Sequence, residues 1–212
     1  MGKTKKLYVS IGFLIAFVVW TLLLGVVDVG PIGPLGAEVG FASLNGWVHD
    51  FTGVHMDLYT VTDWLGLVPI AVVFGFGLLG LIQWIKRRKI GSVDRSILVL
   101  GGFYIVVMAV YVFFELVVIN YRPVLIDGCL EVSYPSSTTL LVMCVMPTAL
   151  MQLWKRINGR VWRLCVAVMI VTFMTFMVIG RLISGVHWIS DIIGGALLST
   201  GLVTAYAWLE QS

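Results

Sequence analysis

Uncharged apolar runs of about 20 residues recur along this chain, and each run is long enough for a helix to cross the ~30 Å hydrocarbon core of a bilayer. Two of the clearest cover residues 7–27 and 64–85. Of the 212 residues, 59% are hydrophobic and only 12% are charged, and the mean hydropathy is +1.01. A chain inside lipid must satisfy its backbone polar groups internally. These features predict an all-α, polytopic membrane protein.

We predict six transmembrane helices that form a single membrane domain over residues 1–212. The amino-terminal run exceeds the apolar core of a signal peptide, which is about 7–15 residues, so we interpret it as the first span. The polar stretch at residues 28–63 is predicted to be an outer loop, with an interfacial helix near residues 38–48. A core that carries the motifs is expected at about residues 96–209. The spans are expected at about residues 7–27, 64–85, 96–119, 136–154, 161–179 and 188–209.

Lysine and arginine are distributed unevenly among the connections. Twelve of the 14 lie in the amino-terminal tail, between spans two and three, and between spans four and five. With six spans these regions share one side, which the positive-inside rule makes cytoplasmic. We therefore expect both termini in the cytoplasm and a bacterial plasma membrane as the location. The other two cations, Arg122 and Arg181, fall at the outer ends of spans three and five, where an anion-binding role explains both.

The remaining compositional features exclude several classes of protein. The net charge of +3 follows from the topology signals, so no nucleic-acid partner is expected. The three cysteines have no metal-ligand spacing, and their odd number argues against a disulfide framework. We predict no metal and no cofactor. Nothing in the sequence specifies an oligomeric state.

One stretch between the last two spans concentrates residues suited to chemistry. It runs from Gly180 to Asp191 and contains Arg181 and His187. If the chain is helical from Trp188 onward, His187 and Asp191 lie four residues apart on one helix face. A carboxylate at that spacing can hold one imidazole nitrogen and leave the other free for reaction. The stretch therefore predicts a site at the outer side of the membrane.

Three short segments meet at this outer side. They are residues 115–123, which end in Arg122-Pro123; the run Pro135-Ser136-Ser137-Thr138; and Gly180-Arg181, five residues, His187, three residues and Asp191. In order and spacing they resemble the motifs of the type 2 phosphatidic acid phosphatase (PAP2) superfamily, which read Lys-x6-Arg-Pro, Pro-Ser-Gly-His and Ser-Arg-x5-His-x3-Asp. The resemblance covers the region from span three to span six.

The resemblance implies a six-helix bundle and a role for each residue that matches. His187 would attack phosphorus and form a phosphohistidine, and Asp191 would orient it. Arg122 and Arg181 would bind the phosphate oxygens, with a donor added by the hydroxyl or amide of Ser136. Positioning and charge neutralisation carry most of phosphoryl transfer, and this chemistry needs no metal.

Four positions depart from the family's motifs. Glu115 stands where the family has lysine, and Ser137 replaces the glycine that lies close to the phosphate. Thr138 replaces the histidine that protonates the leaving oxygen, and Gly180 replaces a serine. A hydroxyl is a poor acid near neutral pH, and general acid catalysis is typically worth about 10²–10⁴-fold. The nucleophile side of the family's site is therefore intact, and the leaving-group side is altered.

These departures leave several alternatives open. The chain is expected to dephosphorylate a membrane lipid phosphate or diphosphate, of either the isoprenoid or the phosphatidic-acid type. His49 or His55 is a candidate for the missing proton donor, and Glu115 is a candidate ion-pair partner for Arg122 or Arg181. A second alternative is a catalytically impaired relative that binds phosphorylated lipid. A membrane transporter is a third, but the charged residues cluster at one face and do not line a path.

Overall fold

The computed structural model describes residues 2–211, and its regular structure is helical. Within that range the β-type pairing is limited to three isolated bridges in the connections. Six helices or helix pairs are long and apolar enough to span a membrane, so the predicted all-α, six-span fold is confirmed. The elements are α1 (Lys3–Leu24), η1 (Pro34–Gly36), α2 (Ala42–Thr52), α3 (Met56–Leu65), α4 (Leu67–Arg87), η2 (Ile90–Ser92), α5 (Arg95–Leu116), α6 (Ser137–Arg156), α7 (Arg160–Ile183) and α8 (Ile189–Leu209).

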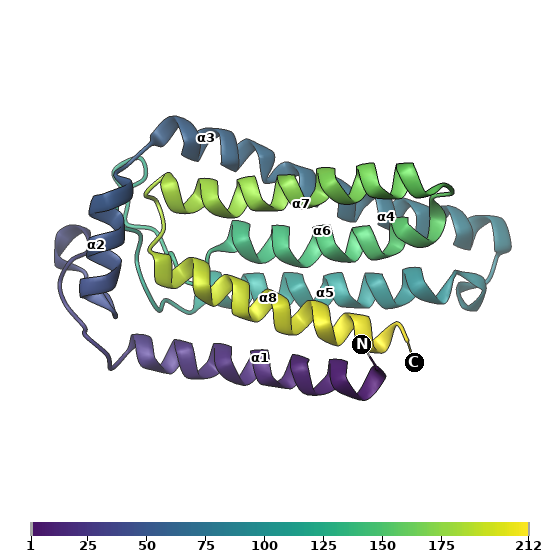
Figure 1. Cartoon of the computed structure of the whole chain (residues 1–212), viewed down its shortest axis with the longest axis horizontal. Coiled ribbons are helices and arrows are strands. Elements are labelled where there is room, and N and C mark those ends of the chain that lie inside the picture. Colours follow the sequence, from purple (N-terminus) through teal and green to yellow (C-terminus); the bar gives the residue numbers. More distant parts are fainter. Residues whose placement is uncertain (1, 212) are drawn as a thin grey trace.

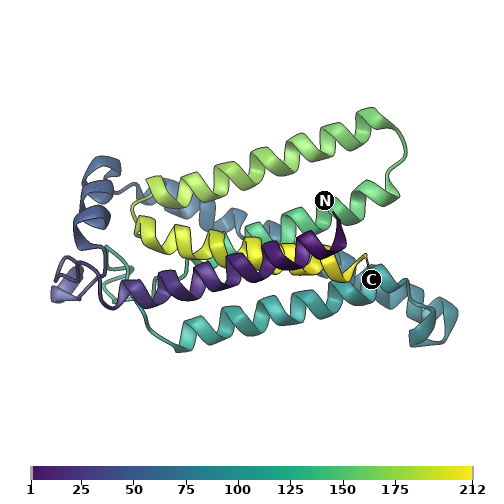
Figure 2. The same ribbon diagram turned by 60° about the horizontal axis from the view of Figure 1, so that its bottom comes forward.

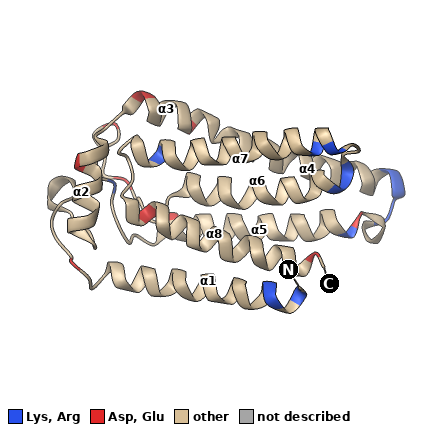
Figure 3. Ribbon diagram, in the orientation of Figure 1, with Lys and Arg blue, Asp and Glu red and all other residues tan. Residues whose placement is uncertain are grey.

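The long helices lie side by side, and their connections alternate between the two ends of the bundle (Figure 1). Both ends of the described chain lie at one end, together with the α4–α5 and α6–α7 connections. Most of the lysines and arginines gather at this same end, as Figure 3 shows. The opposite end carries α2, the segment between α5 and α6, and the α7–α8 connection. The three segments of the predicted site therefore meet at the end away from the basic cluster.

Helix α8 lies at the centre of the bundle, where it packs along α1 and against α6. Helices α5 and α7 lie on opposite sides of this group (Figure 2). Apolar burial drives little helix association within lipid, so close packing and interhelical hydrogen bonds hold such a bundle together. One such bond joins Ser10 Oγ to the carbonyl of Gly201 at 2.8 Å. Phe17, Leu140 and Tyr206 belong to the buried cluster between these helices.

The polar stretch at residues 28–63 was expected to be a loop with one interfacial helix. It contains a helix near that place, α2, and also most of α3, which was not expected. Helix α2 begins at Ala42 and lies across the end of the bundle (Figure 1), four residues later than the predicted interfacial helix. Helix α3 begins at Met56 and continues through Gly66, whose backbone is helical, into α4. The second span is therefore a helix pair of 32 residues, and its polar first third extends over the site.

Candidate active site

The segment between α5 and α6 folds back on itself and brings the first motif against the second. Asp127 and Gly128 form its turn, each with a positive φ (49° and 77°), and Ile126 and Cys129 on either side exchange backbone hydrogen bonds. Asp-Gly in a two-residue turn with positive φ at both positions is typical of a tight hairpin. Further back, the Arg122 amide donates to the carbonyl of Glu131 at 3.0 Å.

The α7–α8 connection places His187 at the centre of this end. Gly185 has a φ of +69°, and a Cβ there would lie 2.2 Å from the carbonyl oxygen of Gly53, so the connection packs tightly against the α2–α3 loop. Helix α8 begins only at Ile189, after Trp188 as its N-cap. The prediction that His187 and Asp191 share a helix face is therefore wrong. The Asp191 carboxylate instead folds back and accepts from the Trp188 amide at 3.0 Å.

A serine hydroxyl lies between His187 and Asp191. The distance from His187 Nδ1 to Asp191 Oδ2 is 3.8 Å, beyond hydrogen-bond reach. Ser133 Oγ lies 3.0 Å from His187 Nδ1 and 2.5 Å from Asp191 Oδ2. The other carboxylate oxygen accepts from Asn120 Nδ2 at 3.3 Å. The imidazole is thus connected to the carboxylate through Ser133.

The Nε2 atom of His187 is buried and has no hydrogen-bond partner among the described residues. The residue is 3% exposed, and Nε2 makes no hydrogen bond to any described residue. Burial lowers the pKa of His187 from 6.5 to about 4, and the charges of Arg122 and Arg181 act in the same direction. The imidazole is therefore neutral at physiological pH, which is the form that a nucleophile needs.

The two arginines of the motifs lie close enough to stack on one ring, that of Tyr59 in α3. Their guanidinium carbons are 4.9 Å (Arg181) and 5.7 Å (Arg122) from the ring centre. Each arginine also pairs with a carboxylate: Arg181 Nη2 with Asp63 Oδ1 at 2.9 Å, and Arg122 Nε with Glu131 Oε2 at 3.1 Å. Their Nη1 atoms are buried without a hydrogen-bond partner among the described residues.

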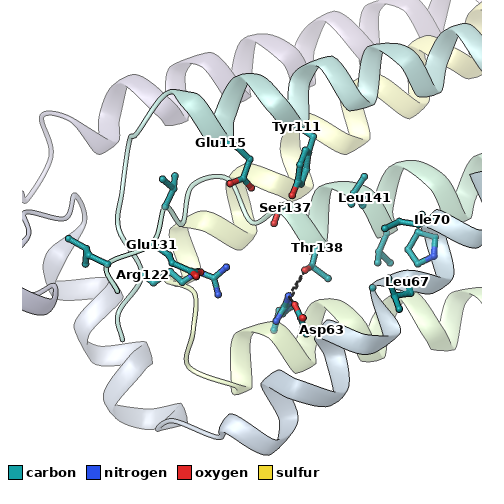
Figure 4. A pocket seen from close by; sticks show the side chains of 16 residues that line it. Asp63, Leu67, Ile70, Tyr111, Glu115, Arg122, Glu131, Ser137, Thr138 and Leu141 are labelled. Atoms are coloured by element: carbon teal, nitrogen blue, oxygen red, sulfur yellow. Dashed lines mark hydrogen bonds and ion pairs between the residues drawn. The ribbon is translucent and has the colours of Figure 1, made fainter. Parts of the chain in front are cut away.

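A cavity of about 530 Å³ opens beside these arginines. Figure 4 shows Glu115 reaching into it from α5, on the side opposite Asp63. Glu115, a candidate partner for either arginine, forms no ion pair with them among the described residues, and Asp63 and Glu131 are their partners instead. His187 is not among the described residues that line the cavity. The polar lining consists of Asp63, Tyr111, Glu115, Arg122, Glu131, Ser137, Thr138 and Arg181.

Helix α6 begins at this cavity and holds one of the arginines. Ser136 is its N-cap, and its hydroxyl accepts from the Thr139 amide at 3.4 Å. The Ser136 amide donates to the carbonyl of Asp191, so of the two donors suggested for phosphate the hydroxyl is the one left with a free proton. Ser137 faces the cavity. Thr138 Oγ1 accepts from Arg181 Nε and Nη2 at 2.9 and 2.7 Å, and it thereby fixes the guanidinium.

Two other residues that we singled out from the sequence lie outside the cavity. His49 Nε2 contacts the Gly185 carbonyl at 3.2 Å, and His55 Nε2 contacts the Thr52 carbonyl at 3.0 Å. Neither histidine is among the described residues that line the cavity, so the structure does not support either as the proton donor.

The departure at Gly180 has a steric reason. A Cβ at this position would lie 2.8 Å from the methyl group of Thr62, because α3 packs directly on α7 there. This close approach brings Tyr59 and Asp63 over Arg181. Sequence reasoning missed both of these α3 residues, and it also missed Ser133.

Comparison with known proteins gives one family match and one similar fold. Residues 118–212 match the PAP2 superfamily. The fold is similar to the crystal structure of a transmembrane PAP2-type phosphatidylglycerolphosphate phosphatase from Bacillus subtilis, with a TM-score of 0.58 and 16% sequence identity over 96% of each chain. At that identity the likeness concerns the fold. No curated protein matches the sequence.

Proposed function

We propose that this chain is a membrane protein of the PAP2 superfamily, and that it removes phosphate from a membrane lipid phosphate or diphosphate through a phosphohistidine on His187. The family and the fold support a membrane lipid phosphatase in general terms. The substrate, the intermediate and the role of each residue are our inference from the geometry of the site.

The observation that carries the proposal is a group of buried nitrogen atoms without hydrogen-bond partners among the described residues. They are His187 Nε2, the Nη1 atoms of Arg122 and Arg181, and Arg122 Nε, whose contact with Glu131 is an ion pair without a hydrogen bond. Buried polar groups are otherwise almost always paired, so such a group needs an explanation. Two guanidinium groups and a neutral imidazole suit a tetrahedral anion such as phosphate. The guanidinium groups can donate to its oxygens, and the imidazole nitrogen can approach its central atom.

The reaction then proceeds in two displacements. His187 Nε2 attacks phosphorus, and the bond from phosphorus to the lipid oxygen breaks. The leaving oxygen keeps the bonding pair and takes a proton from water. Arg122 and Arg181 neutralise the charge on the phosphoryl oxygens. Water next attacks the phosphohistidine, which releases phosphate and restores the neutral imidazole.

The residue at position 138 favours a substrate whose leaving group needs little protonation. Thr138 is committed to Arg181 and is a poor acid. A lipid diphosphate releases a phosphate monoester, which leaves more readily than an alkoxide does. The B. subtilis protein is named for a lipid phosphate monoester, phosphatidylglycerolphosphate. Both classes therefore belong in the test.

A second candidate is a protein that binds phosphorylated lipid and turns it over slowly or not at all. The observation that favours it is the pairing of both arginines with carboxylates, Asp63 and Glu131, because a phosphate must compete with these partners. His187 is 3% exposed and is not among the residues that line the cavity, which favours the same candidate.

We further propose that the site faces the outer leaflet and that both termini are cytoplasmic. The lysines and arginines gather at the end of the bundle that carries the termini (Figure 3), and such residues are enriched in cytoplasmic connections. In a protein whose exposed native cysteines, Cys129 and Cys165, are replaced by serine, the accessibility of cysteines introduced at Asp127 and at Asn158 to a membrane-impermeant thiol reagent tests this orientation. Labelling from outside at position 158 but not at 127 would reverse it.

Phosphate release from proteoliposomes distinguishes the two candidate functions. The substrates are an isoprenoid diphosphate, phosphatidic acid and phosphatidylglycerolphosphate. The enzyme is expected to lose activity by at least about 10³-fold in His187→Ala, since the nucleophile is gone. His55→Ala, a histidine outside the cavity, is the matched control and should retain activity. If the wild type and His187→Ala release phosphate equally slowly from all three lipids while the wild type still binds them, the binding function is the correct one.

A further inference from the structure

We infer that Ser133 is a positioning residue for His187: its hydroxyl connects the Asp191 carboxylate to His187 Nδ1 and selects the tautomer in which Nε2 carries the free lone pair. This inference rests on the proposed function, because it concerns the nucleophile of that reaction. No motif that we recognised in the sequence includes Ser133.

The distances exclude a direct link between the imidazole and the carboxylate. His187 Nδ1 and Asp191 Oδ2 are 3.8 Å apart, whereas an N–H···O hydrogen bond spans about 2.7–3.2 Å. Ser133 Oγ lies within hydrogen-bond distance of both, at 3.0 and 2.5 Å. The carboxylate therefore acts on the ring through a hydroxyl.

The direction of these hydrogen bonds follows from the number of protons available. An ionised carboxylate can only accept, and Asp191 also accepts from the Trp188 amide and from Asn120 Nδ2. Ser133 has one hydroxyl proton, and it donates that proton to Asp191. Its oxygen must then accept from His187, so the ring carries its proton on Nδ1. Nε2 is left unprotonated, buried and without a partner among the described residues.

The opposite tautomer would be inert and poorly accommodated. With the proton on Nε2, that nitrogen could not attack phosphorus, and Nδ1 would compete with Asp191 for the one Ser133 proton. When phosphate is on Nε2, the ring becomes cationic. The same Nδ1–H···Oγ–H···Oδ2 chain then lets Asp191 stabilise that charge across the hydroxyl.

The hydroxyl is held in place by its surroundings. Ser133 is 3% exposed, and its amide donates to the carbonyl of Asn120 at 2.9 Å across the hairpin. The next residue, Tyr134, is anchored by a 2.7 Å hydrogen bond between its hydroxyl and that of Thr21 in α1. A side chain so constrained cannot swing away, so it fixes the ring's protonation site.

Nitrogen-15 NMR of histidine-labelled protein in detergent tests the tautomer directly, without any turnover. Resonances absent from the His187→Ala spectrum identify His187. At about pH 7 the wild type should show a protonated Nδ1 and an unprotonated Nε2. Ser133→Ala and Ser133→Cys should shift His187 toward protonated Nε2, since alanine offers no hydrogen bond and a thiol only a weak one. Ser133→Thr, which keeps the hydroxyl, should retain the wild-type pattern.

Steady-state kinetics on the same variants provide the second measurement. Ser133→Ala and Ser133→Cys should lower kcat by about 10- to 100-fold with KM changed less than about twofold, because the substrate contacts are untouched. Ser133→Thr should recover most of the loss. Cysteine is close to serine in volume, so it separates loss of the hydrogen bond from a cavity effect.

The two measurements separate the inference from the proposed function. An unchanged His187 spectrum in both Ser133→Ala and Ser133→Cys would overturn the inference, whatever the activity. A shifted spectrum in a protein that hydrolyses none of the lipids would retain Ser133 as the tautomer-setting residue and overturn the enzymatic function.

Discussion

Arg181 donates from Nε and Nη2 to the hydroxyl of Thr138, at 2.9 and 2.7 Å. The residue at the position of the family's histidine therefore anchors a cation of the cavity. A few contacts of this kind determine the charge around the cavity and the chemistry available to a leaving group. Each contact can be tested separately.

Thr138→Val is expected to destabilise the protein. Two buried guanidinium donors lose their acceptor, which should lower the free energy of unfolding by about 1–3 kcal/mol. Thermal unfolding in detergent measures it. Thr139→Val is the matched control, because Thr139 Oγ1 is buried without a partner among the described residues and its removal should be neutral or stabilising. Equal losses in both variants would show that the Arg181 contacts are not the cause.

Asp63→Asn is expected to strengthen the binding of orthovanadate, a phosphate analogue. The aspartate competes for Arg181, but its side chain is 59% exposed and screened by water, so the gain should be at most about fivefold, which corresponds to about 1 kcal/mol. The gain should shrink as salt is added. Calorimetric titration measures it, with Asp57→Asn on the same helix as the control. Weaker binding by Asp63→Asn than by Asp57→Asn would refute competition by this carboxylate.

The pH dependence of activity should reflect the burial of His187, whose pKa is lowered to about 4. The neutral nucleophile persists down to about that pH, so the acid limb of kcat/KM due to this residue should fall near pH 4 and not near 6.5. Initial rates on a lipid diphosphate across the acid range measure it. A limb that His187 controls near pH 6.5 would mean that the ring is more exposed to water than the structure indicates.

The stability of the protein should depend on the same ionisation. An imidazole in the unfolded chain takes up a proton near pH 6.5, whereas the folded protein resists protonation until about pH 4. The stability contributed by neutral burial is thus complete above about pH 6.5 and is lost as the pH falls toward 4, by up to about 3 kcal/mol. Denaturant unfolding from about pH 8 to 4.5 should show a steeper loss for the wild type than for His187→Asn. Parallel curves would contradict the expectation.

Gly180→Ser, which restores the family's residue, should destabilise the contact between α3 and α7. The new Cβ would lie 2.8 Å from the Thr62 methyl group, and overpacking of this kind costs typically about 1–3 kcal/mol. Thr62→Ser removes the methyl group while keeping the hydroxyl. The double variant should therefore recover most of the thermal stability lost in Gly180→Ser. No recovery would place the strain elsewhere.

The fold followed from the sequence because lipid imposes strong rules. Long apolar runs located all six spans, and the basic residues identified which connections share an end. The failure at α3 has a clear origin. That segment contains Asp57, Asp63 and several hydroxyl residues, and this polar composition predicts a loop. In the structure the segment is a helix that leads directly into α4. Polar composition does not distinguish a loop from a helix that projects beyond the bilayer.

The sequence predicted which residues come together at one end of the bundle, but not the contacts that connect them. Motif spacing indicated Arg122, Arg181, His187 and Asp191, and the structure brings them to one end of the bundle. The contacts made by Ser133 and Asp63 depend on how distant segments pack, which spacing does not encode. One local signal was present, however. Asp127-Gly128 is a strong hairpin dipeptide and indicates that the chain folds back there. The pairing of Asn120 with Ser133 is shifted by two residues from the register of that turn, so the dipeptide alone does not predict it.

The continuity of α3 and α4 has a mechanical consequence. At 1.5 Å per residue, the 32 residues from Met56 to Arg87 make a rod of roughly 48 Å, well over the ~30 Å of hydrocarbon that α4 must cross. A helix adjusts its tilt to the thickness of the membrane around it. Tyr59 and Asp63 lie in α3, the part of this helix pair beyond α4. A change in the tilt of α4 therefore shifts both side chains relative to Arg122 and Arg181. The geometry of the site thus depends on the thickness of the surrounding bilayer.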